Sequence, residues 1–147
     1  MVICDSSYAF VNYLKEVGVL CIGWKLKPST EQFRNLYWQA LQFVKTNPKI
    51  RYYSTDISRI GPFDTDQEAW LSREYYPQVA ETIGQDIYAA VIFSEGHFNA
   101  LVNNYMATHR LPLHEFIHFN YFTDKEEAMD WLQYMQKGQD LAILAKS

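Results

Sequence analysis

The stretch Ile87-Tyr88-Ala89-Ala90-Val91-Ile92-Phe93 is an unbroken apolar run. A strand that helices cover on both faces has this composition, as in parallel sheets, whereas a strand with one wet face alternates apolar and polar residues. The run is far too short to span a bilayer. It predicts a buried strand in the middle of an α/β sheet.

A helical pattern begins well before this run, at Pro28. Ser29 and Gln32 have the spacing of a capping box, and Asn47-Pro48 provides the stop signal. Apolar residues recur between these signals at helical spacing. The predicted buried stripe consists of Phe33, Leu36, Tyr37, Ala40, Leu41 and Val44.

A second helical pattern leads directly into the apolar run. Thr65 and Glu68 form another capping-box pair, and acidic residues in this first turn suit the helix dipole. Pro77 should kink or split the helix, and Gly84 should end it. Its apolar stripe repeats every four residues and comprises Leu71, Tyr75, Val79 and Ile83.

Further strand patterns lie on both sides of these helices. Residues 8–14 and 19–25 are rich in β-formers and predict a hairpin, in which Gly18 supplies the permissive turn. Residues 50–57 and 116–122 predict two more strands. A third helix is expected over 98–105.

The last helical pattern follows the final strand. Thr123 and Glu126 have capping-box spacing, and a buried stripe of Ala128, Trp131, Leu132 and Met135 follows. A short apolar tail, Leu141-Ala142-Ile143-Leu144, follows Gly138 and could pack on the core or on another subunit.

The expected order of elements is therefore ββαβαβαβα. We predict an α/β fold with a single mixed sheet of about five strands and helices packed on it. A chain of 147 residues fits one domain, 1–147, with a core of about 8–136 and a tail at 138–147.

Composition excludes some classes of function. The net charge of −4 and the lack of a basic stripe argue against nucleic-acid binding. No secretory signal or transmembrane segment is recognisable, which predicts a cytoplasmic protein. Cys4 and Cys21 lack metal or redox spacing and are expected to be buried free thiols.

Two stretches resemble the STAS group, named for sulfate transporters and anti-sigma factor antagonists, and more closely the small bacterial proteins of SpoIIAA-like fold. They are residues 66–71, continuing to Tyr75-Tyr76-Pro77, and residues 122–132. The resemblance implies a non-enzymatic domain that binds a protein partner in a bacterial cytoplasm. Some members of the group are related to the SEC14 lipid-binding fold, which implies the alternative of a small apolar ligand between sheet and helices.

The phosphorylation motif of the anti-sigma factor antagonists is absent. Residues 56–66 contain no Asp-Ser-Ser-Gly-like turn, and Asp5-Ser6-Ser7 lies at the wrong end of the chain. A phosphate on Thr65 would be repelled by Asp64 and Asp66. A phosphorylation switch is therefore not carried over from the family.

The stretch His114-Glu115-Phe116-Ile117-His118 matches the HExxH pattern of zinc proteases. That chemistry needs a helix, so that both histidines share a face and the glutamate activates water. The surrounding aromatic residues favour a strand, on which the histidines stand too far apart to chelate. A metal-dependent hydrolase built on His114, Glu115 and His118 is thus a remote alternative, and we expect no metal or cofactor.

The carboxyl ends of parallel strands are the usual ligand sites of open α/β sheets. Asp56, Ser58 and Arg59 follow one predicted strand, Ser94 and His97 follow the next, and Thr65 opens the helix between them. We take these six residues as candidates for binding a ligand or partner. Asp56, Ser58 and His97 include the residue types of a hydrolytic triad, but no nucleophile elbow accompanies them. The lone histidines His97 and His109 fit surface or capping roles.

Some aromatic residues fall outside the predicted core stripes. They are Trp38, Trp70, Tyr76 and Tyr134. Exposed large aromatics mark protein interfaces or ligand pockets. We therefore expect a homodimer or a protein partner, with the second helix and the preceding loop as the recognition surface.

Overall fold

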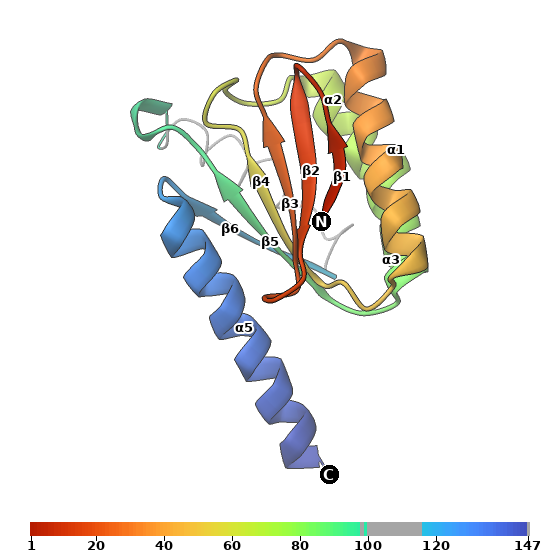
Figure 1. Ribbon diagram of the computed structural model, residues 1–147, viewed down its shortest axis with the longest axis vertical. Helices are drawn as coiled ribbons and strands as arrows, with labels where there is room; N and C mark the ends of the chain where they lie inside the picture. Colours follow the sequence, from red (N-terminus) through yellow and green to blue (C-terminus); the bar gives the residue numbers. More distant parts are fainter. Residues whose placement is uncertain (98, 100–115, 147) are drawn as a thin grey trace.

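The computed structural model describes residues 1–97, 99 and 116–146 (Figure 1). The predicted helix at 98–105 and the residues His109, His114 and Glu115 lie outside the described part. The described residues form a mixed α/β fold around one sheet.

The sheet has six strands, which lie side by side in chain order. The strands β1, β2 and β3 are antiparallel, and β3, β4, β5 and β6 are parallel. Their bounds are β1 Val2–Asp5, β2 Ala9–Leu14, β3 Val19–Trp24, β4 Tyr52–Asp56, β5 Ile87–Ile92 and β6 Ile117–Phe122. The α/β class with a mixed sheet is confirmed, but the expectation of about five strands is wrong because β1 was not predicted.

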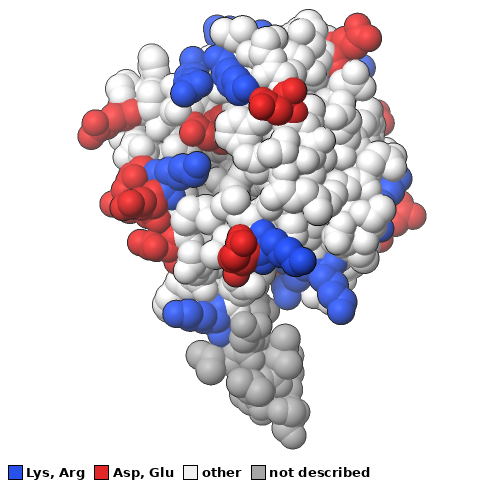
Figure 2. Space-filling view, in the orientation of Figure 1, with Lys and Arg blue, Asp and Glu red and all other residues white. Residues whose placement is uncertain are grey.

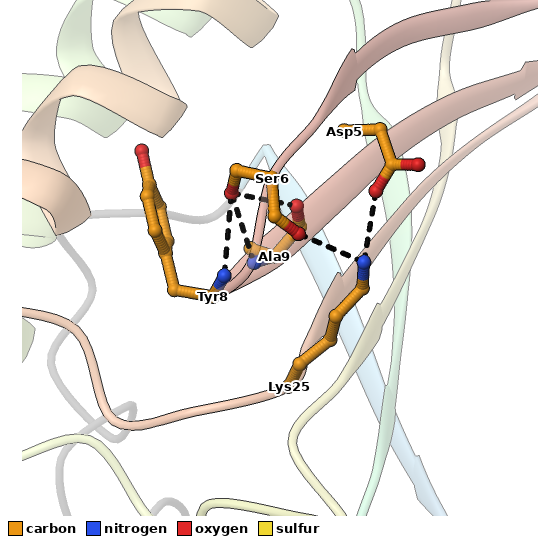
Figure 3. A network of polar contacts seen from close by, with 5 residues as sticks. All are labelled: Asp5, Ser6, Tyr8, Ala9 and Lys25. Atoms are coloured by element: carbon orange, nitrogen blue, oxygen red, sulfur yellow. Dashed lines mark hydrogen bonds and ion pairs between the residues drawn. The ribbon is translucent and has the colours of Figure 1, made fainter.

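Strand β1 is held at the sheet edge by polar contacts around the turn into β2 (Figure 3). The Lys25 ammonium, just after β3, donates to Asp5 Oδ1 and to the Ser6 carbonyl, both at 2.8 Å. Ser6 Oγ accepts from the backbone N–H groups of Tyr8 and Ala9 at 3.4 and 3.2 Å, and donates to the Ala9 carbonyl at 3.0 Å. Ser6, which superficially matches the phosphorylation motif, therefore has a turn-forming role.

The predicted hairpin is present as β2 and β3. Gly18 has a φ of 67°, a left-handed conformation that suits glycine because it has no Cβ. Strand β5 is paired in parallel on both sides, and five of its six residues are buried, as its apolar run predicts.

The helices form two layers, one on each face of the sheet (Figure 1). Helices α1 (Thr30–Thr46), α2 (Thr65–Trp70) and α3 (Tyr76–Ile83) lie on one face, and α5 (Lys125–Lys146) contacts β4, β5 and β6 on the other. Ser29 caps α1 in the predicted box with Gln32. All six residues of the predicted α1 stripe are buried.

The predicted caps of the other two helices are each one residue out of place. Asp64, not Thr65, caps α2, and its box partner is Gln67, because the Asp64 carboxylate accepts from Gln67 N at 2.7 Å. At α5 the Asp124 carboxylate, rather than Thr123, accepts from Glu126 N at 3.2 Å.

Pro77 divides the second predicted helix, as expected. A π-helical segment, Leu71–Tyr75, separates α2 from α3, and the Tyr76 N–H bonds to the Leu71 carbonyl. Since proline has no N–H and its ring crowds the preceding turn, the helix widens just before it. Gly84, with φ of 67°, ends α3 as predicted.

Gly138 does not end the last helix. The backbone of α5 continues through it to Lys146, so residues 138–146 of the expected tail belong to this helix. Figure 1 shows that the C-terminal part of α5 extends beyond the sheet.

Two further expectations concern the surface and the cysteines. Cys21 is buried, but Cys4 is only half-buried, and both are free thiols. None of the helices in the described residues is long and apolar enough to cross a membrane. In the view of Figure 2, basic and acidic side chains alternate around a largely uncharged centre.

Candidate ligand-binding cavity

A cavity of about 70 Å³ lies between the sheet and the layer formed by α1, α2 and α3. Its size exceeds the roughly 10–15 Å³ that one water molecule requires, so it is larger than an ordinary packing gap. The described residues around it are mostly apolar and aromatic. They are Ile22, Tyr37, Tyr53, Thr55, Phe63, Glu68, Tyr75, Tyr76, Val79, Ile87, Ala89, Val91, Ile117 and Phe119.

The floor of the cavity is the face of the parallel strands that points toward α3. Because side chains alternate along a strand, β4 contributes Tyr53 and Thr55, while β5 contributes Ile87, Ala89 and Val91. Ala89 lies in the middle of this floor and is only half-buried, whereas its neighbours on β5 are buried. Because the side chain of Ala89 is only a methyl group and the residues around it are larger, it leaves the space that the cavity occupies.

The roof is made by the divided helix. Glu68 on α2, Tyr75 at the end of the π segment and Tyr76 at the start of α3 all line the cavity. The π segment adds an extra residue to the turn, which brings the consecutive residues Tyr75 and Tyr76 both against it. Pro77 therefore shapes the cavity without lining it.

Glu68 is a carboxylate in an otherwise apolar layer, and only 7% of it is exposed. Its charge acts on the surrounding tyrosines. Burial raises the pKa of Tyr37 and of Tyr76 well above the usual value, and the charge of Glu68 raises both further. The pKa of Tyr121 is raised in the same way, first by burial and then by Glu68.

The tyrosine hydroxyls at the cavity differ in their hydrogen bonding. The Tyr53 hydroxyl donates to the Ile50 carbonyl at 2.8 Å. Tyr37 and Tyr75 are 6% and 7% exposed, and neither hydroxyl forms a hydrogen bond with a described residue. Burial raises the pKa of both.

The buried indole N–H of Trp24 lies beside this group. It favours the ionised form of Tyr37 and so slightly lowers the pKa that burial raises. The Trp24 nitrogen has no other hydrogen-bond partner among the described residues.

Sequence reasoning missed Glu68, Tyr37 and Tyr75 as site residues. Glu68 was assigned to a surface capping box with Thr65, although it precedes Leu71 by three residues and therefore shares the buried face of the helix. That spacing was the available signal. Nothing in the sequence distinguishes the tyrosines at the cavity from ordinary core residues.

The predicted strand-end residues lie elsewhere, at the carboxyl edge of the sheet. Asp56 ends β4, and its carboxylate accepts from Ser58 N at 2.9 Å, which stabilises the turn there. After β5, the Ser94 hydroxyl and His97 Nδ1 are 2.9 Å apart within one turn. No hydrogen bond between described residues joins these two groups, so they do not form a triad.

The other two strand-end candidates are exposed. Arg59 is on the turn after β4, and Thr65 is the first residue of α2. A hollow of about 120 Å³ at this edge is lined by other described residues, namely Lys27, Pro28, Ile60, Pro62, Asp64 and Gln67. A ligand role for the strand-end residues stays a prediction.

The four predicted interface aromatics differ in exposure. The expectation that Trp70 is exposed is wrong, because only 8% of it is exposed and it packs on Phe33. Trp38 is half-buried against Trp70, and Tyr76 is half-buried at the cavity. Tyr134 on α5 is 74% exposed.

His118 lies on strand β6, as its aromatic neighbours predict. Its Nε2 is 3.0 Å from Asp86 Oδ2, and its ring stacks on Tyr88. Among the described residues there is no cluster of three side chains suited to hold a metal.

Comparisons with known proteins gave no relatives. No protein-family model, no curated protein and no solved structure matches this chain.

Proposed function

We propose that this protein is a small-molecule-binding domain that holds an apolar ligand between its sheet and helices α1–α3. The single observation that carries the proposal is the 70 Å³ cavity, whose wall is mostly apolar and aromatic and includes a few polar groups. Concave, mostly apolar sites with few polar groups are the usual form of ligand pockets. Among the functions considered from the sequence, this is the non-enzymatic ligand-binding alternative.

Binding to a protein partner was the first expectation, with α2 and the preceding loop as the surface. The burial of Trp70 removes the aromatic residue on which that surface depended. Membership of the STAS-like group and a cytoplasmic location remain predictions.

The test uses toluene as an apolar probe and NMR of methyl groups. We expect toluene to shift the methyl signals of Val79, Val91 and Ile117, which line the cavity, and to leave that of Leu132 on the opposite face unchanged. Native mass spectrometry of the freshly purified protein would show whether a cellular ligand remains bound.

Two variants at one position provide the control. Ala89→Leu fills the floor of the cavity and should abolish the toluene shifts, whereas Ala89→Ser adds little volume and should preserve them. Circular dichroism confirms that both variants are folded. Toluene shifts that persist in folded Ala89→Leu, or are absent from the wild type, would refute the proposal.

Self-association is the second candidate, favoured by the exposure of Tyr134 on a helix that extends beyond the sheet (Figure 1). Light scattering would decide it. A dimer that Tyr134→Ser dissociates supports this candidate, and a monomeric wild type at high concentration rejects it.

A further inference from the structure

The size of the cavity restricts the ligand further, and this inference rests on the proposed function. A dry apolar cavity of about 150 Å³ accommodates one molecule of benzene. The cavity between the sheet and helices α1–α3 measures about 70 Å³, so a single ring already fills it. A long acyl chain or a sterol is far larger than this space.

The rings on the helix side of the wall are held in place by a second layer of aromatic residues behind them. Phe33 meets Tyr37 and Phe63 edge to face, with ring centroids 5.0 Å apart in each pair. Trp70 stacks on Tyr75 at 6.0 Å. Phe33 and Trp70 are themselves only 1% and 8% exposed, so the rings of the wall cannot turn outward without displacing buried side chains.

The opposite wall is the sheet itself. Strand β5 supplies Ile87, Ala89 and Val91 to the floor and is paired with both β4 and β6. Moving this floor away from a larger ligand would break backbone hydrogen bonds of the central parallel strands, which is destabilising. The cavity therefore has little capacity to widen between its floor and its roof.

Extra volume in a well-packed core is unfavourable, because it forces side chains out of their preferred rotamers. The same penalty applies to a ligand that exceeds the cavity. We propose that the ligand is a compact apolar molecule no larger than a single ring, and that Tyr37, Phe63 and Tyr75 set this upper limit. A fatty acyl chain, a sterol and a fused bicyclic ring are excluded by the same wall.

Three probes test the limit: toluene is a single ring, naphthalene is a fused pair of rings, and 1-octanol represents an acyl chain. Their dissociation constants are measured by NMR titration of the intact chain, from the methyl signals of Val91 and Ile117. Affinity for an unrestricted apolar site rises with the apolar area buried, so naphthalene would bind such a site more tightly than toluene. We expect the reverse order here, with naphthalene and 1-octanol binding about tenfold or more weakly than toluene.

Enlarging the cavity should raise the limit. Val79 on α3 is 3% exposed and lines the cavity, so in Val79→Ala naphthalene should bind about tenfold more tightly than in the wild type. Val44→Ala is the matched control, because Val44 on α1 is 1% exposed and is not among the described residues that line the cavity. It should keep the preference for toluene. Val91→Ala, which enlarges the floor of the same cavity, repeats the test with Ile117 as the reporter, and circular dichroism shows which variants are folded.

The outcomes distinguish this inference from the proposed function. If naphthalene or 1-octanol shifts the same methyl signals and binds the wild type as tightly as toluene, the size limit is overturned and the ligand-binding function stands. A limit that is unchanged in the folded enlarged variants, or that is lost equally in Val44→Ala, would show that the wall of the cavity does not set it. If none of the three probes shifts these signals, the proposed function fails as well.

Discussion

The two faces of the sheet are covered in different ways. On the face of α1, α2 and α3, three helices bury a large core that includes tyrosine hydroxyls, a carboxylate and a cavity. On the opposite face, among the described residues, α5 covers a small cluster, and rings stack across neighbouring strands beside it, with Tyr52 on Tyr88 and Tyr88 on His118. The cavity and its polar groups make the first face the better candidate for a ligand site.

The largest expected effect comes from alkaline pH, because the tyrosines with raised pKa lie on the cavity face. Those that also line the cavity are Tyr37, Tyr53, Tyr75 and Tyr76. A tyrosine whose pKa is higher in the folded than in the unfolded state stabilises the fold fully at pH values below its unfolded pKa of about 10. This stabilisation is lost as the pH rises above that value. Each group contributes about 1.4 kcal/mol per pH unit, so four groups give a slope of roughly 5 kcal/mol per unit.

Urea unfolding between pH 8 and 11.5, followed together with tyrosinate absorbance, measures this slope. Tyr75→Phe should reduce it by about a quarter. A free energy of unfolding that stays constant up to pH 11.5 would show that these hydroxyls are not protected from ionisation.

The next effect compares the two cores by truncation. Phe33 is 1% exposed and contacts Trp24, Phe63 and Trp70, so Phe33→Ala should lower the free energy of unfolding by about 3–5 kcal/mol. Leu132 on α5 is equally buried, and Leu132→Ala should lower the free energy of unfolding by about 2–3 kcal/mol. Chemical denaturation measures both, and the exposed Tyr134→Ala is the control, expected within about 0.5 kcal/mol. An equal or larger loss of unfolding free energy in Leu132→Ala would contradict the expectation that the α1–α3 face contributes more to stability.

A smaller effect probes the part of the α5 face that the helix does not reach. There Gly23 on β3 pairs with Phe10 on β2, and a Cβ on Gly23 would collide with the Phe10 ring. We expect Gly23→Ala to destabilise the protein by about 1–3 kcal/mol. The Phe10 ring thus covers Gly23 on a part of the sheet that α5 does not reach.

A double-mutant cycle isolates that contact. Phe10→Leu should remove most of the penalty of Gly23→Ala, whereas Gly96→Ala, which has open space around it, should have little effect. Additive losses from the two changes would contradict the proposed collision.

The sequence predicts those parts of the fold that depend on local pattern. The β5 run, the Ser29 cap and the α1 stripe are strong periodic signals, and all three are confirmed. Strand β1 was missed because Val2–Asp5 is short and half-exposed, and because it is fixed by Lys25, a partner 20 residues from Asp5. Contacts of that kind leave no periodic signal in the sequence.

The cavity could not be predicted for a related reason. A cavity is a mismatch of volumes among residues from different elements, here Ala89 on β5 against Tyr75 and Tyr76 above it. Taken singly, each of these residues is typical of an ordinary hydrophobic core. Only Glu68 carries a local signal, and the neighbouring capping pattern obscured it.

The smallest expected effect tests directly whether Asp64 or Thr65 caps α2, because the cap of α2 determines which way Glu68 points. The Asp64 carboxylate accepts from Gln67 N, and its carbonyl accepts from Glu68 N at 3.0 Å, so the first turn is set one residue before Thr65. Asp64→Ala should therefore lower the free energy of unfolding by about 1 kcal/mol, as measured by thermal or urea unfolding. Thr65→Ala, on the exposed first residue of the helix, should change it by less than about 0.5 kcal/mol. The reverse order of the two losses would mean that Thr65, rather than Asp64, caps the helix.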